Sequence, residues 1–244
     1  ISDNAGAYTN DLPLDYKDVT ISLKADGSTV TTTYDAASKS FLSSQSAISG
    51  KSYTIEVQDN AGERSTVFAR SFIPEQVRNK SIGYIENGGT DMDGRPSDLL
   101  SIEWTDQAGS NYYMLHFYYY SETVDLFVPF EFQLNDPSLK APETMKLNDG
   151  GFLFNDVLFN SQTKKIEVVP PGGLVAANSD VLYLIELRSV TRDFYNYYKT
   201  LQQYRDRDDL QQAGPFGSAV IVHSNITNGL GAFIASNIES DTIR

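Results

Sequence analysis

The residues with the clearest capacity for chemistry are acidic ones in the stretch 87–98. Asp91 and Asp93 stand two positions apart and precede Gly94, and Ca²⁺ takes roughly six to eight oxygen ligands of this kind. The candidate calcium ligands are Asn87, Asp91, Asp93 and Asp98. No glutamate stands where an EF-hand places its last ligand. The alternative interpretation is a polar turn in which Asp and Gly serve the backbone geometry.

An aromatic run at residues 112–120 is a second candidate, because aromatic faces stack on sugars and other flat ligands. Side chains on a strand alternate between its two faces. One set is therefore expected in the core: Tyr113, Leu115, Phe117 and Tyr119. The opposite set, which includes Met114, is exposed or covered by a helix, and its candidate ligand-binding residues are Tyr112, His116, Tyr118 and Tyr120. The alternative is aromatic packing between sheet and helix.

Catalytic patterns are missing from the sequence. The only histidines are His116 and His223, and neither stands in a Gly-x-Ser-x-Gly or His-Glu-x-x-His context. The chain contains no cysteine, which excludes thiol nucleophiles, thiolate zinc sites and disulfides. We therefore expect no catalytic residues and no cofactor other than calcium. A pair of carboxylates across a cleft, as in glycosidases, leaves a hydrolase as an alternative.

The amino-acid composition limits the classes of ligand and the architecture that the chain can have. The formal net charge is −13, from 19 basic and 32 acidic residues, and such a charge repels phosphate backbones, which argues against nucleic acid as a ligand. The chain has 244 residues, of which 40% are hydrophobic, enough for one large or two ordinary domains with real cores. No apolar run approaches the roughly 20 residues of a membrane helix.

The pattern of elements predicts a mainly β protein of two domains. In residues 1–74, short alternating strands such as Val19-Thr20-Ile21 and a turn at Asp26-Gly27 predict an immunoglobulin-like β-sandwich. Pro74 marks the boundary. Residues 75–244 predict a β-rich domain, sandwich or barrel-like, with a glycine- and aspartate-rich loop at 87–98. An apolar stripe predicts one amphipathic helix near 192–207.

The C-terminal stretch contains a β-rich run at 219–222 and then Asn228-Gly229-Leu230-Gly231. Glycines two apart favour a bend with positive φ. The stretch predicts a strand, a tight bend and a last strand that close the second domain near the Tyr-rich helix. No catalytic group is expected there.

In this order of elements the chain resembles a family of uncharacterised Bacteroidetes outer-membrane lipoproteins, whose members tend to be encoded beside TonB-dependent receptors. The matching stretches are residues 106–113, 155–159, 187–201, 215–216 and 224–233. The resemblance covers most of the chain from about residue 76 and brings no catalytic residues with it.

The resemblance implies location and partners. It places the protein at the outer membrane, on the cell surface or the periplasmic side, held by a lipid-bearing cysteine upstream of Ile1. It also implies a TonB-dependent receptor as partner and a small molecule, peptide or glycan as ligand. The expected function is non-enzymatic ligand capture for nutrient uptake. The alternatives are a structural or adhesive surface module and a hydrolase acting on glycans or peptides.

Overall fold

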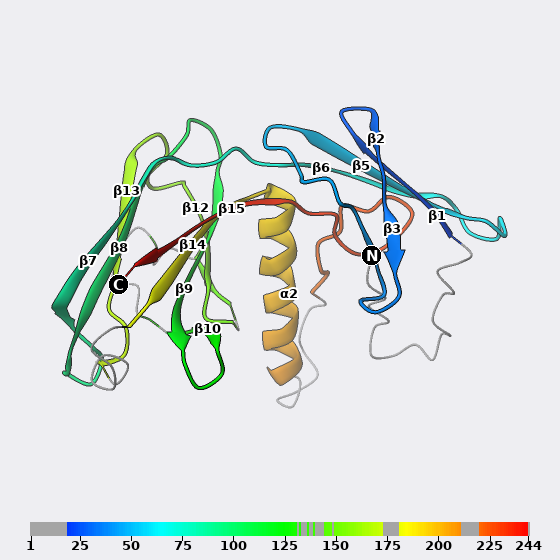
Figure 1. Cartoon of the computed structure of the whole chain (residues 1–244). Coiled ribbons are helices and arrows are strands. Elements are labelled where there is room, and N and C mark those ends of the chain that lie inside the picture. Colours follow the sequence, from blue (N-terminus) through cyan, green and yellow to red (C-terminus); the bar gives the residue numbers. More distant parts are fainter. Residues whose placement is uncertain are drawn as a thin grey trace.

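The computed structural model describes residues 19–130, 132, 136, 139, 144–147, 149–172, 181–210 and 220–243. In these residues the protein is mainly β, with several antiparallel sheets, one helix and no closed barrel (Figure 1). The predicted fold class is thereby confirmed, whereas the immunoglobulin-like arrangement of the first domain stays a prediction. Within the same residues, no helix has the length and apolar character needed to span a bilayer.

The N-terminal part is a four-stranded antiparallel sheet in the order β2-β1-β5-β6, accompanied by a separate hairpin, β3-β4. The strands are β1 (Val19–Ala25), β2 (Ser28–Val30), β3 (Thr33–Asp35), β4 (Ser40–Leu42), β5 (Ser52–Asp59) and β6 (Val67–Phe72). Asp26 and Gly27 both have positive φ, 46° and 84°, and make the predicted hairpin turn between β1 and β2. Residues 73–77 form no regular element and contain the boundary predicted at residue 74.

Two further sheets form the C-terminal part. The smaller has the order β13-β8-β7, and the larger has the order β11-β12-β9-β14-β15, with β10 paired to β9. The strands are β7 (Arg78–Thr90), β8 (Pro96–Thr105), β9 (Tyr112–Ser121), β10 (Leu126–Pro129), β11 (Met145–Lys146), β12 (Phe152–Asn155), β13 (Thr163–Val168), β14 (Tyr183–Val190) and β15 (Ser236–Ile243). One buried cluster takes side chains from both sheets, so the sheets pack face to face.

Strand β9 shows how the core is divided. Tyr113, Leu115 and Phe117 belong to the cluster between the two sheets. Met114, on the opposite face of β9, belongs instead to a second buried cluster with Phe194 and Tyr195 of α2 (Arg192–Leu210). The predicted alternation along this strand and the predicted helix are both confirmed. The C-terminal part therefore has three layers: sheet, sheet and helix.

The prediction of a loop over residues 87–98 is wrong. Strand β7 continues to Thr90 and β8 starts at Pro96, so only residues 91–95 connect them. The ladder continues through the Asn- and Gly-rich segment because its register shifts between Ile85 and Gly89, and Asn87 takes a positive φ of 50°. A bulge of this kind absorbs residues that otherwise favour a loop.

The prediction of a strand at 219–222 is also wrong for the residues that the structure describes. Residue 219 lies outside the described part of the chain, and residues 220–226 form no regular strand. Part of the segment bonds to α2, as when the His223 N–H donates to Thr200 Oγ1 at 2.8 Å. The segment then reaches the N-terminal sheet, where Thr227 and Phe68 form an antiparallel bridge. The segment thus connects the C-terminal part to the N-terminal sheet. Of the two strands predicted to close the second domain, β15 is the one that pairs with its sheet.

Candidate ligand-binding site

A cleft of about 670 Å³ lies where the N-terminal sheet meets the C-terminal sheets. Its walls come from the end of β6, the linker 73–77, the loop before β9 and the β14–α2 junction, and they mix aromatic, polar and charged side chains. The lining residues include Phe72, Glu75, Asn111, Tyr112, Thr191 and Arg192. The volume falls within the roughly 300–1,000 Å³ of small-ligand sites, which often lie at domain junctions.

The helical wall of the cleft is held by packing and by a cap. Thr191 Oγ1 accepts a hydrogen bond from the Phe194 N–H at 3.2 Å, which satisfies one of the free donors in the first turn of α2. The Tyr112 ring lies 4.9 Å from the Tyr195 ring, so α2 fixes this aromatic wall. Arg192 is exposed at the helix start and faces a cleft that also contains Glu75. The wall therefore offers one stacking surface and both signs of charge.

The loop wall of the cleft is held by Asn111. Its backbone N–H and its side-chain Nδ2 both donate to Asp156 Oδ2, at 2.9 and 3.0 Å. In return the Asp156 N–H donates to the Asn111 carbonyl at 3.1 Å. Asp156 is buried, so these bonds are shielded from water and keep the loop in one conformation.

A second buried carboxylate stands behind this wall. Asp106 Oδ1 accepts from the Tyr113 hydroxyl at 2.5 Å, and Oδ2 accepts from the Ser161 N–H at 2.7 Å. Burial raises the pKa of Asp106, although the bonds from Tyr113 and Ser161 act in the opposite direction. Burial also raises the pKa of the Tyr113 phenol, and the nearby Asp106 adds to this effect. Both groups anchor the back of the cleft.

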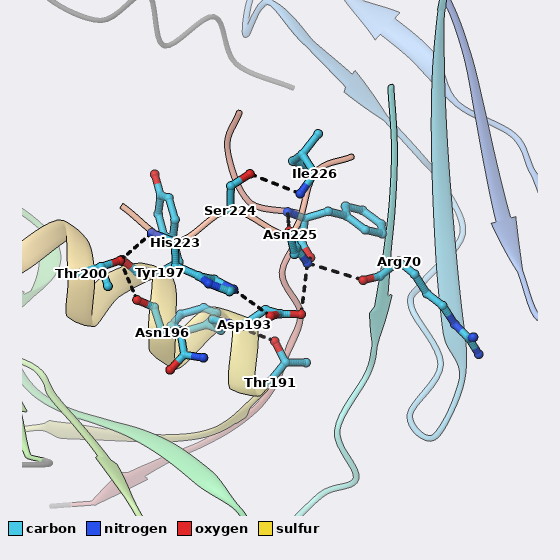
Figure 2. A network of polar contacts seen from close by, with 12 residues as sticks. Arg70, Thr191, Asp193, Asn196, Tyr197, Thr200, His223, Ser224, Asn225 and Ile226 are labelled. Carbon is cyan, nitrogen blue, oxygen red and sulfur yellow. Dashed lines mark hydrogen bonds and ion pairs between the residues drawn. The ribbon is translucent and has the colours of Figure 1, made fainter. Parts of the chain in front are cut away.

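A polar network at the start of α2 ties the C-terminal segment to β6 (Figure 2). His223 Nε2 lies 2.8 Å from Asp193 Oδ1, and Asn225 Nδ2 donates to Asp193 Oδ2 at 3.2 Å. Figure 2 shows Asn225 between Asp193 on the helix and Arg70 on the strand, whose carbonyl lies 3.5 Å from Asn225 Nδ2. One aspartate in the first turn of α2 thereby fixes the segment that reaches the N-terminal sheet.

Asn225 also closes the bend of its own segment. Its Oδ1 accepts from the Phe233 N–H and its Nδ2 donates to the Phe233 carbonyl, both at 2.8 Å. Further along, Asn228 Nδ2 donates to the Thr66 carbonyl at 3.0 Å, just before β6 begins. Side-chain amides therefore replace part of the backbone ladder at this edge of the sheet.

Neither histidine contacts a serine hydroxyl in the described residues. His223 pairs with Asp193, whereas Ser224 Oγ accepts from the Ile226 N–H at 3.3 Å. His116 is 2% exposed and has its Nε2 3.0 Å from Asp149 Oδ1. Burial opposes ionisation of Asp149, but the interaction with His116 outweighs it and lowers the pKa of that carboxyl.

The four ligand-binding residues predicted on β9 have different surroundings. Tyr112 lines the junction cleft. His116 is buried beside Asp149, and its ring stacks on Tyr118 at 5.7 Å. Burial and the neighbouring Glu186 raise the pKa of Tyr118 to about 12, and its hydroxyl donates to Glu186 Oε2 at 3.3 Å. The hydroxyl of Tyr120 bonds to Asp125 in the β9–β10 hairpin.

The predicted calcium ligands accept hydrogen bonds from the protein itself. Asp91 Oδ1 accepts from the N–H groups of Asp93 and Arg95, at 2.9 and 2.8 Å, and its Oδ2 accepts from the Gly172 N–H at 2.7 Å. The bonds from Arg95 and Gly172 hold the pKa of Asp91 below its ordinary value. Asp93 pairs with Arg95 at 3.1 Å.

The other two predicted calcium ligands, Asn87 and Asp98, contact each other. Asp98 Oδ1 accepts from the Asn87 N–H at 3.0 Å, and its Oδ2 accepts from the hydroxyls of Tyr84 and Tyr183, at 3.2 and 3.1 Å. In the part of the chain that the structure describes, no group of three or more acidic or histidine side chains could hold a metal ion. The turn interpretation accounts for these contacts, and calcium binding stays a prediction.

Several residues that shape the cleft and the network were not predicted as site residues: Asn111, Asp156, Thr191, Arg192, Asp193 and Asn225. Thr191 and Asp193 carried a local signal, because Thr and Asp favour helix starts. Asn111 and Asp156 stand 45 positions apart. Nothing local in the sequence indicates that such distant residues meet.

Comparison with known proteins supports a single assignment. Residues 2–242 match a family described as a domain of unknown function, DUF4249. A search of curated proteins and a search of solved structures both found no match. Since the family match spans nearly the whole chain, the protein belongs to the DUF4249 family.

Proposed function

We propose that the protein is a non-enzymatic lipoprotein of the Bacteroidetes outer membrane, on the cell surface or the periplasmic side. It captures a ligand in the junction cleft and presents it to a TonB-dependent receptor. The lipid anchor and the receptor rest on the sequence resemblance. The ligand-binding role rests on the cleft itself.

The cleft is the observation that carries the proposal. Its volume of about 670 Å³ suits a small molecule or a short segment of a polymer. Tyr112 is held against Tyr195, and the Asn111 loop is held by buried Asp156, so the walls are formed before a ligand arrives. A preformed site loses little conformational freedom on binding. Arg192 and Glu75 add charges that orient a polar ligand.

Binding can be tested by thermal melting against panels of oligosaccharides, peptides and small organic nutrients. We expect one class to raise the melting temperature of the wild type and of Tyr120→Ala, which lies outside the cleft. The same class should have much less effect on Tyr112→Ala or Arg192→Ala. A ligand whose effect survives both cleft substitutions binds elsewhere and would remove the cleft from the proposal.

The receptor is tested separately, by purifying the tagged protein from native outer membranes in mild detergent. We expect a TonB-dependent receptor among the recovered proteins and its absence from a mock purification. Repeated recovery without any such receptor would contradict the transport role, whatever the cleft binds.

A further inference from the structure

The outer edge of β6 is only partly covered by the chain itself. Phe68 and Thr227 form an antiparallel bridge there, in which the Phe68 N–H donates to the Thr227 carbonyl at 3.3 Å and the Thr227 N–H donates to the Phe68 carbonyl at 2.9 Å. In an antiparallel pair, successive residues direct their backbone groups to opposite sides. Arg70 and Phe72 therefore present their backbone groups on the same side as Phe68.

Two contacts agree with this orientation. The Arg70 carbonyl faces Asn225 Nδ2 at 3.5 Å, on the Thr227 side. Ser52, which lies opposite Phe72 on β5, uses its own backbone toward β1, where its carbonyl accepts from the Asp26 N–H at 2.8 Å. The Phe72 N–H and C=O consequently point away from β5, and no described residue bonds to them there.

The C-terminal segment that bridges to β6 at Thr227 leaves the outer edge of β6 before it reaches Phe72. Counting from the Phe68–Thr227 bridge, a continued ladder would place Asn225 opposite Arg70 and His223 opposite Phe72. Asn225 contacts Arg70 only through its side chain. His223 turns to α2, where its N–H donates to Thr200 Oγ1 at 2.8 Å. Figure 2 shows this departure of the segment from β6 toward the helix.

The residue whose backbone groups are open is also one that lines the junction cleft. Phe72 lines the cleft on one side, and Thr191, Arg192 and Tyr112 line it on the others. A strand that entered here would continue the line that Thr227 starts, with its backbone paired to β6 and its side chains directed to the cleft walls. Peptides that add to a sheet edge gain affinity from the backbone and specificity from alternate side chains.

We infer that the ligand of the cleft is an extended peptide segment that pairs with the outer edge of β6 at Phe72. This inference rests on the proposed function and names its substrate class. Recognition through the backbone makes the site tolerant of peptide sequence, with the Tyr112 ring and the Arg192 charge selecting among side chains.

The test uses the full chain immobilised on a support and a tryptic digest of reduced, alkylated serum albumin as probe. Peptides retained by the protein are identified by mass spectrometry, and the one retained most strongly is synthesised. We expect N-methylation of its backbone to weaken binding about tenfold at the one position that lies opposite Phe72 and to have little effect at the positions beside it, because the peptide N–H at that position donates to the open Phe72 carbonyl. Recognition through side chains alone produces no single backbone position of this kind.

Two variants address the strand edge. Phe72→Pro removes the N–H that the peptide should contact and, because that group does not pair with β5, a proline is compatible with the edge. Phe72→Ala removes the side chain and keeps the N–H. We expect Phe72→Pro to weaken the peptide about tenfold and Phe72→Ala to weaken it less. If Phe72→Pro does not fold, the N-methyl series on the wild type decides.

The inference is overturned if no peptide is retained, if no single N-methylated position weakens binding, or if Phe72→Pro binds as well as the wild type. Self-association in light scattering that Phe72→Pro abolishes would assign the edge to a second copy and would overturn it as well. An oligosaccharide bound in the cleft, sensitive to Arg192→Ala, would refute the peptide and leave the proposed function standing. If no ligand binds in the cleft and no TonB-dependent receptor is recovered, both the peptide inference and the proposed function are refuted.

Discussion

Asn225→Ala tests whether the polar network joins the C-terminal segment to the rest of the molecule. The substitution removes two neutral hydrogen bonds to Phe233, both 2.8 Å, and one charge-assisted bond to Asp193 at 3.2 Å. Neutral bonds contribute about 1 kcal/mol each and charged ones about 1.5–3 kcal/mol. The sum is roughly 3.5–5 kcal/mol. Because Asn225 is only half-buried, water replaces part of it, and we expect a loss of about 2–3 kcal/mol.

The measurement is urea unfolding followed by tryptophan fluorescence, with Asn237→Ala as the matched control. Asn237 is also half-buried, but its side chain makes one hydrogen bond, from Nδ2 to the Pro74 carbonyl at 3.1 Å. The control should cost about 1 kcal/mol. Limited proteolysis should also cut Asn225→Ala faster in the bend at residues 228–231. The reasoning is refuted if the two alanine variants unfold at the same urea concentration and are cut at the same rate.

Four other predictions address polar groups of the C-terminal part. Gly151→Ala places a Cβ 2.2 Å from His116 Nε2, so we expect a loss of about 1–3 kcal/mol in thermal or urea unfolding, and a smaller loss in a His116→Ala background. The pKa of Asp149 is lower in the folded protein than its unfolded value of 3.8, so the ionised carboxylate stabilises the fold above pH 3.8, and this contribution is lost as the pH falls through the folded pKa. The difference in unfolding free energy between the wild type and Asp149→Asn, measured over a pH series, should therefore shrink below pH 3.8. Tyr113→Phe leaves the buried Asp106 carboxylate without its 2.5 Å donor and should cost about 1.5–3 kcal/mol in urea unfolding, with Tyr120→Phe as a surface control. The turn interpretation predicts that added calcium leaves the melting temperature unchanged, because Asp91 and Asp98 already accept bonds from the protein; a clear increase would favour the calcium site instead.

The parts of the fold that local pattern encodes were predictable. The alternation in β9 separated Tyr113 and Leu115 from Met114 correctly, because each strand residue must choose one face. The apolar stripe identified α2, and Asp26-Gly27 identified a hairpin turn. These signals arise within a few residues of one another.

The site depends on pairs that are distant in the sequence. Asp193 and Asn225 are 32 positions apart, and the bridge from Phe68 leads to Thr227 in another part of the fold. Such pairs form only after the sheets and α2 are placed, so residue type alone could not select Asn225 from the other asparagines. The loop predicted at 87–98 failed for a related reason, since a bulge allowed Asn87 and Gly89 to stay within a strand pair.

The bridge between Phe68 and Thr227 has a consequence for biosynthesis. During synthesis, β6 emerges long before the residues that cover its edge, because Asn228 contacts Thr66 across 162 positions of sequence. Until the C-terminus follows, the N-terminal sheet has an uncovered strand edge, which is a template for pairing with other chains. A truncated product that ends before residue 220 would keep that edge open permanently. Completion of the chain is therefore also the step that protects its beginning from aggregation.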